Sequence, residues 1–214
     1  MQVIVFVTQK GGSGKTTLAL SCAAAAEEQG SRTLVLDMDP QRTAETWYQA
    51  REAPTPKLAT VTASELPNAI TSGRHRFDVI LIDTPGRDEP STAAAIRHAD
   101  LCLIPCRPTP ADMKATPPTV ATIRRLGKLS AFVLNQTPPR GYRIREATKG
   151  LSVLGMVAPM HIVSRNAYQD AQGLGLGVTE LEPDGKAAAE IRKLWQWICK
   201  KLEKLTDEQE THVA

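Results

Sequence analysis

The chain has 214 residues, of which 42% are hydrophobic and 23% charged, and its formal net charge is +3. These values exclude a disordered polyelectrolyte and a uniformly basic surface, but they leave room for a local basic patch. No run is apolar for long enough to span a membrane, and the N-terminus lacks the basic stretch of a signal peptide. Four scattered cysteines do not suit a disulfide framework, so we expect a cytoplasmic protein with one domain over residues 1–214.

Short apolar runs alternate with helical segments along the chain. Strands are predicted at residues 3–7, 33–36, 59–61, 79–82, 101–104, 130–134 and 153–157. Helices are predicted at 16–29, 43–52, 64–72, 91–98, 120–126 and 180–205, with a frayed polar tail from about residue 206. Prolines between 105 and 118 are expected to delay the helix that contains Val120. This alternation predicts an α/β fold, with a mostly parallel twisted sheet flanked by helices on both faces.

The most specific motif joins the first predicted strand to the first predicted helix, and reads Lys10-Gly11-Gly12-Ser13-Gly14-Lys15-Thr16-Thr17. It follows the G-x-x-x-x-G-K-[ST] pattern of a phosphate-binding loop, except that Gln9 stands where the strict form has its first glycine. Glycines let successive N–H groups converge on phosphate oxygens, and the helix N-terminus adds partial positive charge. We expect Lys15 to reach the β and γ phosphates and the Thr16 hydroxyl to ligate Mg²⁺.

Three aspartates follow two of the predicted buried strands. Asp37 and Asp39 come after the second strand, and Asp83 comes after the run that ends at residue 82. In open α/β sheets the ligand crevice lies at the carboxyl ends of the strands, so all three can converge on the phosphates. Asp83 fits a carboxylate that holds Mg²⁺ through water, and Pro85-Gly86 fits a turn that senses the γ-phosphate. For Asp37, a helix-capping or turn role is the open alternative.

The form Lys-Gly-Gly-x-Gly-Lys-Thr-Thr and the segment Asp37-Met38-Asp39-Pro40-Gln41 resemble the ParA/MinD family, whose Walker A box is of a deviant kind. The resemblance implies a P-loop NTPase fold, ATP and Mg²⁺ as ligands, and a dimer in which Lys10 reaches the other subunit's phosphates. It implies that Asp39 positions the attacking water, that Asp37 supports the metal shell, and that Asp83 is the Walker B aspartate. A cation supplied by a second subunit would act on the phosphoryl group as an arginine finger does.

The base of the nucleotide is expected near the last strands. Asn135 ends the strand at 130–134, and its amide could satisfy the donor and acceptor edges of adenine. The resemblance places an asparagine at a similar point, although a turn-forming role is equally open. Residues 158–171 resemble the family segment that borders the base, so Pro159 or Met160 is expected to lean on the purine.

The C-terminal helix predicted from residue 180 has a basic face and an apolar stripe. The stripe is expected to pack on the sheet. The basic face is either solvated surface or a site that binds phosphate backbones without sequence preference. The resemblance favours non-specific DNA, with Lys186 and Arg192 as the first candidates. A membrane-binding helix is not expected, because the polar tail lacks a bulky apolar face.

The resemblance therefore implies a short, ParF-like partition ATPase without an N-terminal helix-turn-helix, since the first strand starts at residue 2. Such a protein dimerises around ATP, binds nucleoid DNA, and hydrolyses ATP when a ParB-like or ParG-like centromere-binding partner stimulates it. A McdA-like ATPase that positions carboxysomes through a cargo adaptor is the first alternative. A synthetase of the same superfamily that phosphorylates a carboxylate is the second, and a membrane-surface regulator is the third. The histidines show no metal-binding spacing, and Cys102 and Cys106 are expected to be core residues.

Overall fold

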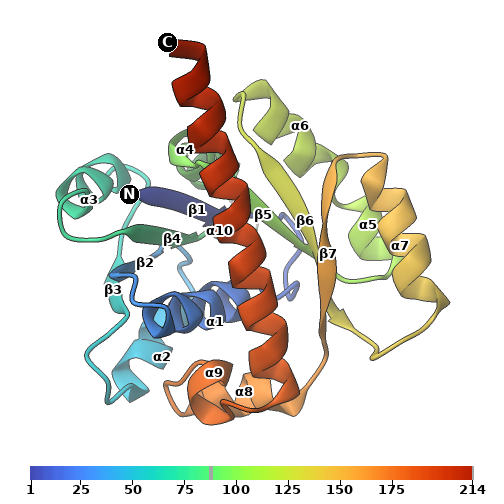
Figure 1. Ribbon diagram of the computed structural model, residues 1–214, viewed down its shortest axis with the longest axis horizontal. Helices are drawn as coiled ribbons and strands as arrows, with labels where there is room; N and C mark the ends of the chain where they lie inside the picture. The colour runs from blue at the N-terminus through green and yellow to red at the C-terminus, as the bar shows by residue number, and fades with distance from the viewer. Residues whose placement is uncertain (87–88, 214) are drawn as a thin grey trace.

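A computed structural model of the chain describes residues 1–86 and 89–213. Its seven strands form one sheet in the order β3-β2-β4-β1-β5-β6-β7 (Figure 1), and all neighbouring strands are parallel. Parallel neighbours require crossover connections, which the helices supply. The predicted α/β fold class is therefore confirmed. The strands are β1 (Gln2–Phe6), β2 (Thr33–Asp37), β3 (Lys57–Thr60), β4 (Val79–Asp83), β5 (Leu101–Cys106), β6 (Ser130–Thr137) and β7 (Met156–Val163).

Successive side chains of each buried strand point to opposite sides of the sheet, so both faces of the sheet are apolar. Helices cover both of these faces. In β1, for example, Ile4 and Phe6 join one core while Val3 and Val5 join the other. The first core is covered by α1 (Lys15–Glu28), α2 (Thr43–Ala50), α8 (Asn166–Gly173), α9 (Val178–Leu181) and α10 (Lys186–Val213). The second is covered by α3 (Leu66–Gly73), α4 (Glu89–His98), α6 (Pro117–Arg125) and α7 (Tyr142–Ser152), with α5 (Pro110–Lys114) beside α7.

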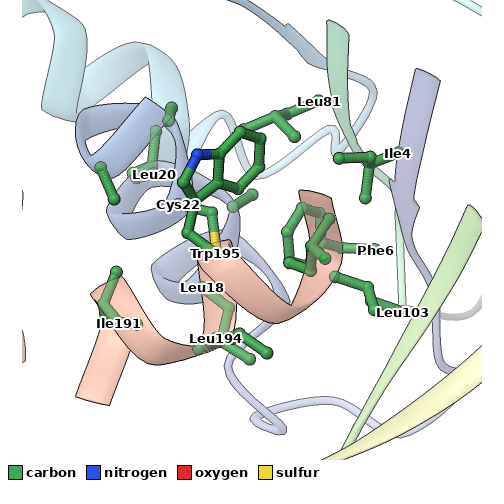
Figure 2. Close-up of a cluster of buried hydrophobic side chains, with 14 of the residues drawn as sticks. Ile4, Phe6, Leu18, Leu20, Cys22, Leu81, Leu103, Ile191, Leu194 and Trp195 are labelled. Carbon is green, nitrogen blue, oxygen red and sulfur yellow. The ribbon is translucent and has the colours of Figure 1, made fainter. Parts of the chain in front are cut away.

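The long helix α10 crosses the sheet on the same face as α1 (Figure 1). Figure 2 shows where the two helices meet the strands. Side chains of α1 and α10 pack there on strand residues, all of them fully buried: Leu18, Leu20 and Cys22 from α1, Ile191, Leu194 and Trp195 from α10, and Ile4, Phe6, Leu81 and Leu103 from the strands. The predicted role of the α10 stripe as core is confirmed for its first five members, Ile191, Leu194, Trp195, Ile198 and Leu202, while the side chain of the sixth, Leu205, lies outside the described residues. Cys102 and Cys106 are also buried, as expected.

Several predicted boundaries were wrong. The prolines begin two helices instead of delaying them: Pro110 is the first residue of α5 and Pro117 is the first residue of α6. The N–H of a first helical residue makes no hydrogen bond within the helix, so proline, which lacks this group, is tolerated there. The last strand runs over Met156–Val163 and not over 153–157, because α7, which no pattern had predicted, occupies the chain as far as Ser152.

The C-terminal region also differs from its prediction. The expected helix at 180–205 is two helices, α9 and α10, separated by a break that contains Pro183 and Gly185. The tail from residue 206, predicted to be frayed, continues α10 to Val213, because it contains neither glycine nor proline to end the helix. Ala214 lies outside the described residues. Within the part of the chain that the structure covers, no helix is both long and apolar enough to cross a bilayer.

Candidate nucleotide-binding site

The loop between β1 and α1 has a backbone shape that depends on glycine. Gly12 and Gly14 have φ of +73° and +88°, in the left-handed region that favours this residue. A Cβ on Gly14 would lie 2.4 Å from the Nδ2 atom of Asn135. That Nδ2 donates a hydrogen bond of 2.7 Å to the Ser13 carbonyl, and Nε2 of Gln136 donates one of 3.0 Å to the Gly12 carbonyl. The end of β6 therefore holds the loop in place.

The loop forms one wall of a hollow of about 740 Å³, within the range of small-molecule sites. The hollow brings together the loop, the Asp39 segment and the turn after β4. Lys15 points into this region but is only 7% exposed. A Cβ on Gly86 would lie 3.6 Å from the Nζ atom of Lys15, so the Lys15 ammonium lies beside the turn after β4. The lining residues are Gly11, Gly12, Gly14, Lys15, Thr16, Thr17, Asp39, Pro40, Gln41, Thr43, Pro85, Gly86, Gln136 and Gln172.

Thr16 and Asp83 form a polar pair at the base of the site. The Thr16 hydroxyl donates a hydrogen bond of 2.6 Å to Oδ2 of Asp83, while Oδ1 is buried and has no hydrogen-bond partner among the residues that the structure describes. Burial raises the pKa of Asp83 to about 7, against the hydrogen bond from Thr16 and the charge of Lys15. An orphaned carboxylate oxygen beside a hydroxyl suits Mg²⁺, which prefers oxygen ligands and keeps several waters. These residues fit the metal that the fold implies.

The Lys15 ammonium is prepared for an anionic ligand. Burial lowers the pKa of Lys15, while the charges of Asp83 and Asp39 act in the opposite direction. A desolvated cation gains more from a phosphate than a hydrated one does, because little further water must be removed. The first turn of α1 adds partial positive charge at the same place.

Asp37 does not line the hollow, although its charge raises the pKa of Asp83, so its support of the metal shell stays a prediction. It is fully buried, its Oδ1 accepts the backbone N–H of Asp39 at 2.9 Å, and its Oδ2 accepts that of Glu45 at 3.3 Å. Both oxygens therefore hold the turn and the first part of α2, as in the capping role that the sequence left open. Asp39 is half-buried, lines the hollow, and accepts the N–H of Gln41 at 3.0 Å.

Lys10 does not line the hollow of its own subunit. Its backbone N–H donates to the Thr8 hydroxyl at 3.2 Å. Burial raises the pKa of Asp112, but hydrogen bonds from Arg107 and Thr109 and the charges of Arg107 and Lys10 bring it below its ordinary value. The charge of Lys10 therefore acts on Asp112 of α5.

A second hollow, of about 140 Å³, shares Gly14, Thr17 and Gln136 with the first. Its further walls come from the ends of β6 and β7 and from α1 and α8: Leu18, Asn135, Val163, Ser164, Arg165, Tyr168 and Gln169. Asn135 lines this hollow with its Nδ2 bonded to the Ser13 carbonyl, and its contact with adenine stays a prediction. Pro159 and Met160 do not line it, and the expectation that they touch a base was wrong. Because β7 extends to Val163, they lie within the strand and face α10.

Gln136 and Gln172 were missed by the sequence analysis. Gln172 lies on α8, accepts a hydrogen bond of 3.2 Å from the Thr17 hydroxyl and lines the larger hollow. Gln136 adopts a positive φ of +50°, which lets its amide reach the loop. No local pattern marks either residue, since each acts on a loop more than a hundred residues away in the chain.

The two proposed DNA residues on α10 have different surroundings. Lys186 is exposed at the first position of the helix. The Arg192 guanidinium donates to both carboxylate oxygens of Glu28, at 2.9 and 2.6 Å, and to the Pro183 carbonyl. Arg192 therefore ties α10 to α1, and a DNA phosphate would have to compete with Glu28 for it, so its contact with DNA stays a prediction.

The raised pKa of Asp83 leads to a prediction for the protein without metal and nucleotide. The pKa is about 7 in the fold against an ordinary 3.8, so the folded state binds this proton more tightly than the unfolded state. The proton on Asp83 therefore stabilises the fold. This contribution to the free energy of unfolding is fully present below about pH 3.8 and is lost as the pH rises through about 7. We expect Asp83→Asn, which stays neutral, to raise the unfolding temperature at pH 8 by about 2–6 °C.

The measurement is thermal unfolding of both proteins in EDTA from pH 5.5 to 8. Asp37, whose pKa burial also raises, is common to both proteins, so the difference between the two curves reports Asp83 together with its charge coupling to Asp37, Asp39 and Lys15. Parallel curves across that range would show that Asp83 does not carry a buried charge in the fold.

Comparisons with known proteins agree with this geometry. A model of the CobQ/CobB/MinD/ParA nucleotide binding domain matches residues 4–174. The maintenance of carboxysome distribution protein A of Halothiobacillus neapolitanus is 30% identical over 85% of this chain and 88% of that protein. The protein ParA of Rhizobium radiobacter is 34% identical over 52% of this chain and 51% of that protein. The structure of MinD from Pyrococcus horikoshii, complexed with Mg-ADP, superposes with a TM-score of 0.76 at 18% identity, covering 92% and 95% of the two chains.

The superposition shows that the predicted P-loop NTPase fold is correct. The matched residues include the phosphate loop, the Asp37–Gln41 segment and the Asp83 turn, which are the three elements that meet at the larger hollow. The chain therefore belongs to the CobQ/CobB/MinD/ParA nucleotide-binding family.

Proposed function

We propose that the chain hydrolyses ATP to ADP and phosphate and uses the cycle for partition or positioning of a cellular cargo. The observation that carries the proposal is the unpaired Asp83 oxygen beside Thr16, below a loop that presents a buried lysine to the hollow. Members of this family include proteins named for chromosome partition and for carboxysome distribution. Both kinds of cargo require a protein that changes its partners with its nucleotide state.

Each residue of the hollow has a proposed task. The loop N–H groups and Lys15 bind the phosphates, and Asn135 and Gln172 border the remainder of the nucleotide. Thr16 and Asp83 would hold Mg²⁺, which neutralises charge on the phosphoryl group during transfer. Asp39 orients the attacking water and accepts its proton, while Asp37 keeps the turn of Asp39 in place. Positioning and charge stabilisation account for most catalysis of this kind.

Lys10 is proposed to act in a second copy of the chain. It does not line its own hollow, although its charge is felt at Asp112 of α5, which leaves it available to a partner subunit. Two copies that clamp two nucleotides would each receive a cation from the other. Because the γ-phosphate would lie at the shared surface, hydrolysis would remove contacts that hold the dimer.

Light scattering with ATP and with ADP tests this proposal, together with phosphate release. We expect a dimer with ATP and Mg²⁺, a monomer with ADP, and slow turnover without a stimulating partner. A carboxylate-activating synthetase would instead release phosphate only when its acid substrate is present. A monomer with ATP, with Lys10 accessible to acylating reagents, would rule out the clamp.

The proposed DNA contact is a patch at the start of α7, which we call the α7 arginine patch and define as Arg140, Arg143 and Arg145. All three are exposed, and within residues 1–86 and 89–213 none of them forms an ion pair. They flank Tyr142 in the chain, and its side chain is 65% exposed. Cations near a helix N-terminus oppose the helix dipole, and α7 has no acidic residue in its first turn to compensate. An unfavourable placement of this kind supports a role in binding phosphates, with Lys186 as a further candidate.

We expect Arg140→Glu/Arg143→Glu to weaken the binding of non-specific duplex DNA by at least about tenfold at low salt, because two phosphate contacts become repulsive. ATP binding should be unchanged. The matched control is Lys57→Glu/Arg97→Glu, which makes the same charge change at residues that line neither nucleotide hollow. DNA retention by the patch variant equal to that of the control would exclude the α7 arginine patch.

The cargo has two candidates. The relatives named for carboxysome distribution cover more of the chain than the ParA relative does, which favours positioning of a carboxysome-like body through an adaptor. Plasmid or chromosome partition with a centromere-binding partner is the other. Stimulation of ATP hydrolysis separates them: the protein that accelerates turnover is a DNA-site binder in the second case and a cargo-bound adaptor in the first.

A further inference from the structure

A groove separate from both nucleotide hollows lies between α10 and the edge strand β7, which run side by side (Figure 1). It encloses about 430 Å³ and is lined by Pro159, Met160, Lys193, Gln196, Trp197 and Lys200. None of these residues lines either nucleotide hollow. Met160 and Trp197 pack partly against the core below, so the groove has an apolar floor. We call it the α10 groove.

The rim of the α10 groove is basic. Lys193 and Lys200 line it, and the Lys201 ammonium lies 5.9 Å from the centroid of the Trp197 ring. None of the six lining residues is acidic. Glu190, one turn earlier on α10, is neutralised by Arg165, whose guanidinium donates to it at 2.5 Å. The groove therefore combines positive charge with an aromatic side chain.

The lysines also have a regular spacing. Lys186, Lys193 and Lys200 are seven residues apart, so they share one face of α10 with a rise of about 10.5 Å between neighbours. A second helix laid along α10 would place residues seven apart at the same interval. Carboxylates in such a register would meet Lys193 and Lys200, and the residue between them would lie over the hollow.

The sequence of the edge strand β7 argues against docking of an extended segment as an additional strand. An extended segment would add to β7 through backbone hydrogen bonds, but Pro159 has no N–H to donate and interrupts that ladder. Duplex DNA would use the lysines but would have no apolar group for the floor formed by Met160 and Trp197. A helix that offers both charge and an apolar side chain uses all of the observed features.

We infer that the α10 groove binds an acidic amphipathic helix of a partner protein. An apolar side chain of that helix fills the hollow against Trp197 and Met160, and carboxylates seven residues apart pair with Lys193 and Lys200. Exposed ion pairs contribute little each, so Trp197 carries most of the affinity and the lysines set orientation and salt dependence. The inference does not depend on the nucleotide chemistry, because no residue is shared with that site.

The test uses a fluorescent helical peptide of about 20 residues, with glutamates seven apart and a phenylalanine midway between them. Fluorescence anisotropy at low salt should show saturable binding to the full chain. Trp197→Ala should weaken binding by at least about tenfold at low and at high salt. Lys193→Glu/Lys200→Glu should weaken it at low salt, because two attractions become repulsions, and less at high salt. Lys57→Glu/Arg97→Glu should bind as the wild type does, and a peptide with lysine in place of glutamate should not bind.

Tryptophan emission gives a second readout. Of the three tryptophans, Trp47 and Trp195 are fully buried, so iodide quenching reports Trp197, and the peptide should protect it. No saturable binding to the wild type, or equal binding by the wild type and both groove variants, would overturn the inference. It would also be overturned if duplex DNA bound the groove with an affinity that Trp197→Ala lowers, or if the peptide displaced a second copy of the chain.

Discussion

Replacing Lys15 with alanine should abolish nucleotide binding at working concentrations, with a loss of affinity of at least about 100-fold. Its ammonium is the buried cation that lines the larger hollow, 7% exposed and beside the turn at Gly86. Removing it deletes a charge-assisted contact to the phosphates. It also leaves the partly ionised Asp83 without its neighbouring cation, so the hollow becomes repulsive to an anion.

The matched control for this prediction is Lys10→Ala. The two lysines flank the same loop, but only Lys15 lines the hollow of its own subunit. We expect Lys10→Ala to bind Mg-ATP as the wild type does in the monomer and to lose ATP-dependent dimerisation. Titration calorimetry with a non-hydrolysable analogue measures affinity, and light scattering measures dimerisation. Equal losses of affinity in the two variants would contradict the division of roles between Lys10 and Lys15.

The parts of the fold that local sequence determines were the parts predicted well. Strands β1, β2 and β4 are short β-branched runs buried on both faces, and each ends in a polar residue or a glycine turn. The phosphate loop needs glycines at fixed positions because of its backbone angles, so its sequence is diagnostic. Thr16 and Asp83 could be assigned for the same reason: one follows the loop directly and the other ends a buried strand.

The features that local sequence did not determine depend on contacts between segments that are distant in the chain. Asp37 and Asp39 are the same residue type two positions apart. Only the structure shows that Asp37 accepts the Asp39 and Glu45 N–H groups while Asp39 lines the hollow. The ion pair of Arg192 could not be foreseen because its partner, Glu28, lies 164 positions away in the chain. The extent of β7, which decides where Pro159 lies, follows from its pairing with β6 and not from its own residues.

Replacing Asp39 with alanine should lower ATP turnover by about 100-fold or more while leaving Mg-ATP binding intact. Asp39 lines the hollow, is half-buried, and is held there by its backbone N–H bond to Asp37. Among the described residues its carboxylate accepts a hydrogen bond from the Gln41 N–H and none from the phosphate loop, and it acts on Lys15 only through its charge, so its loss should leave the residues that bind the nucleotide in place. The ATP-bound dimer should therefore accumulate, and light scattering should show it persisting after the wild type has returned to monomer.

Asp39→Asn separates two forms of this role. Asparagine keeps an oxygen that can accept the Gln41 N–H and hold a water, but it cannot take a proton at neutral pH. If Asp39 only orients the water, this variant should retain part of the turnover; if Asp39 accepts the proton, it should be as slow as the alanine variant. Thermal unfolding of both variants should match that of the wild type. Wild-type rates in Asp39→Ala would move the catalytic role to another residue of the hollow.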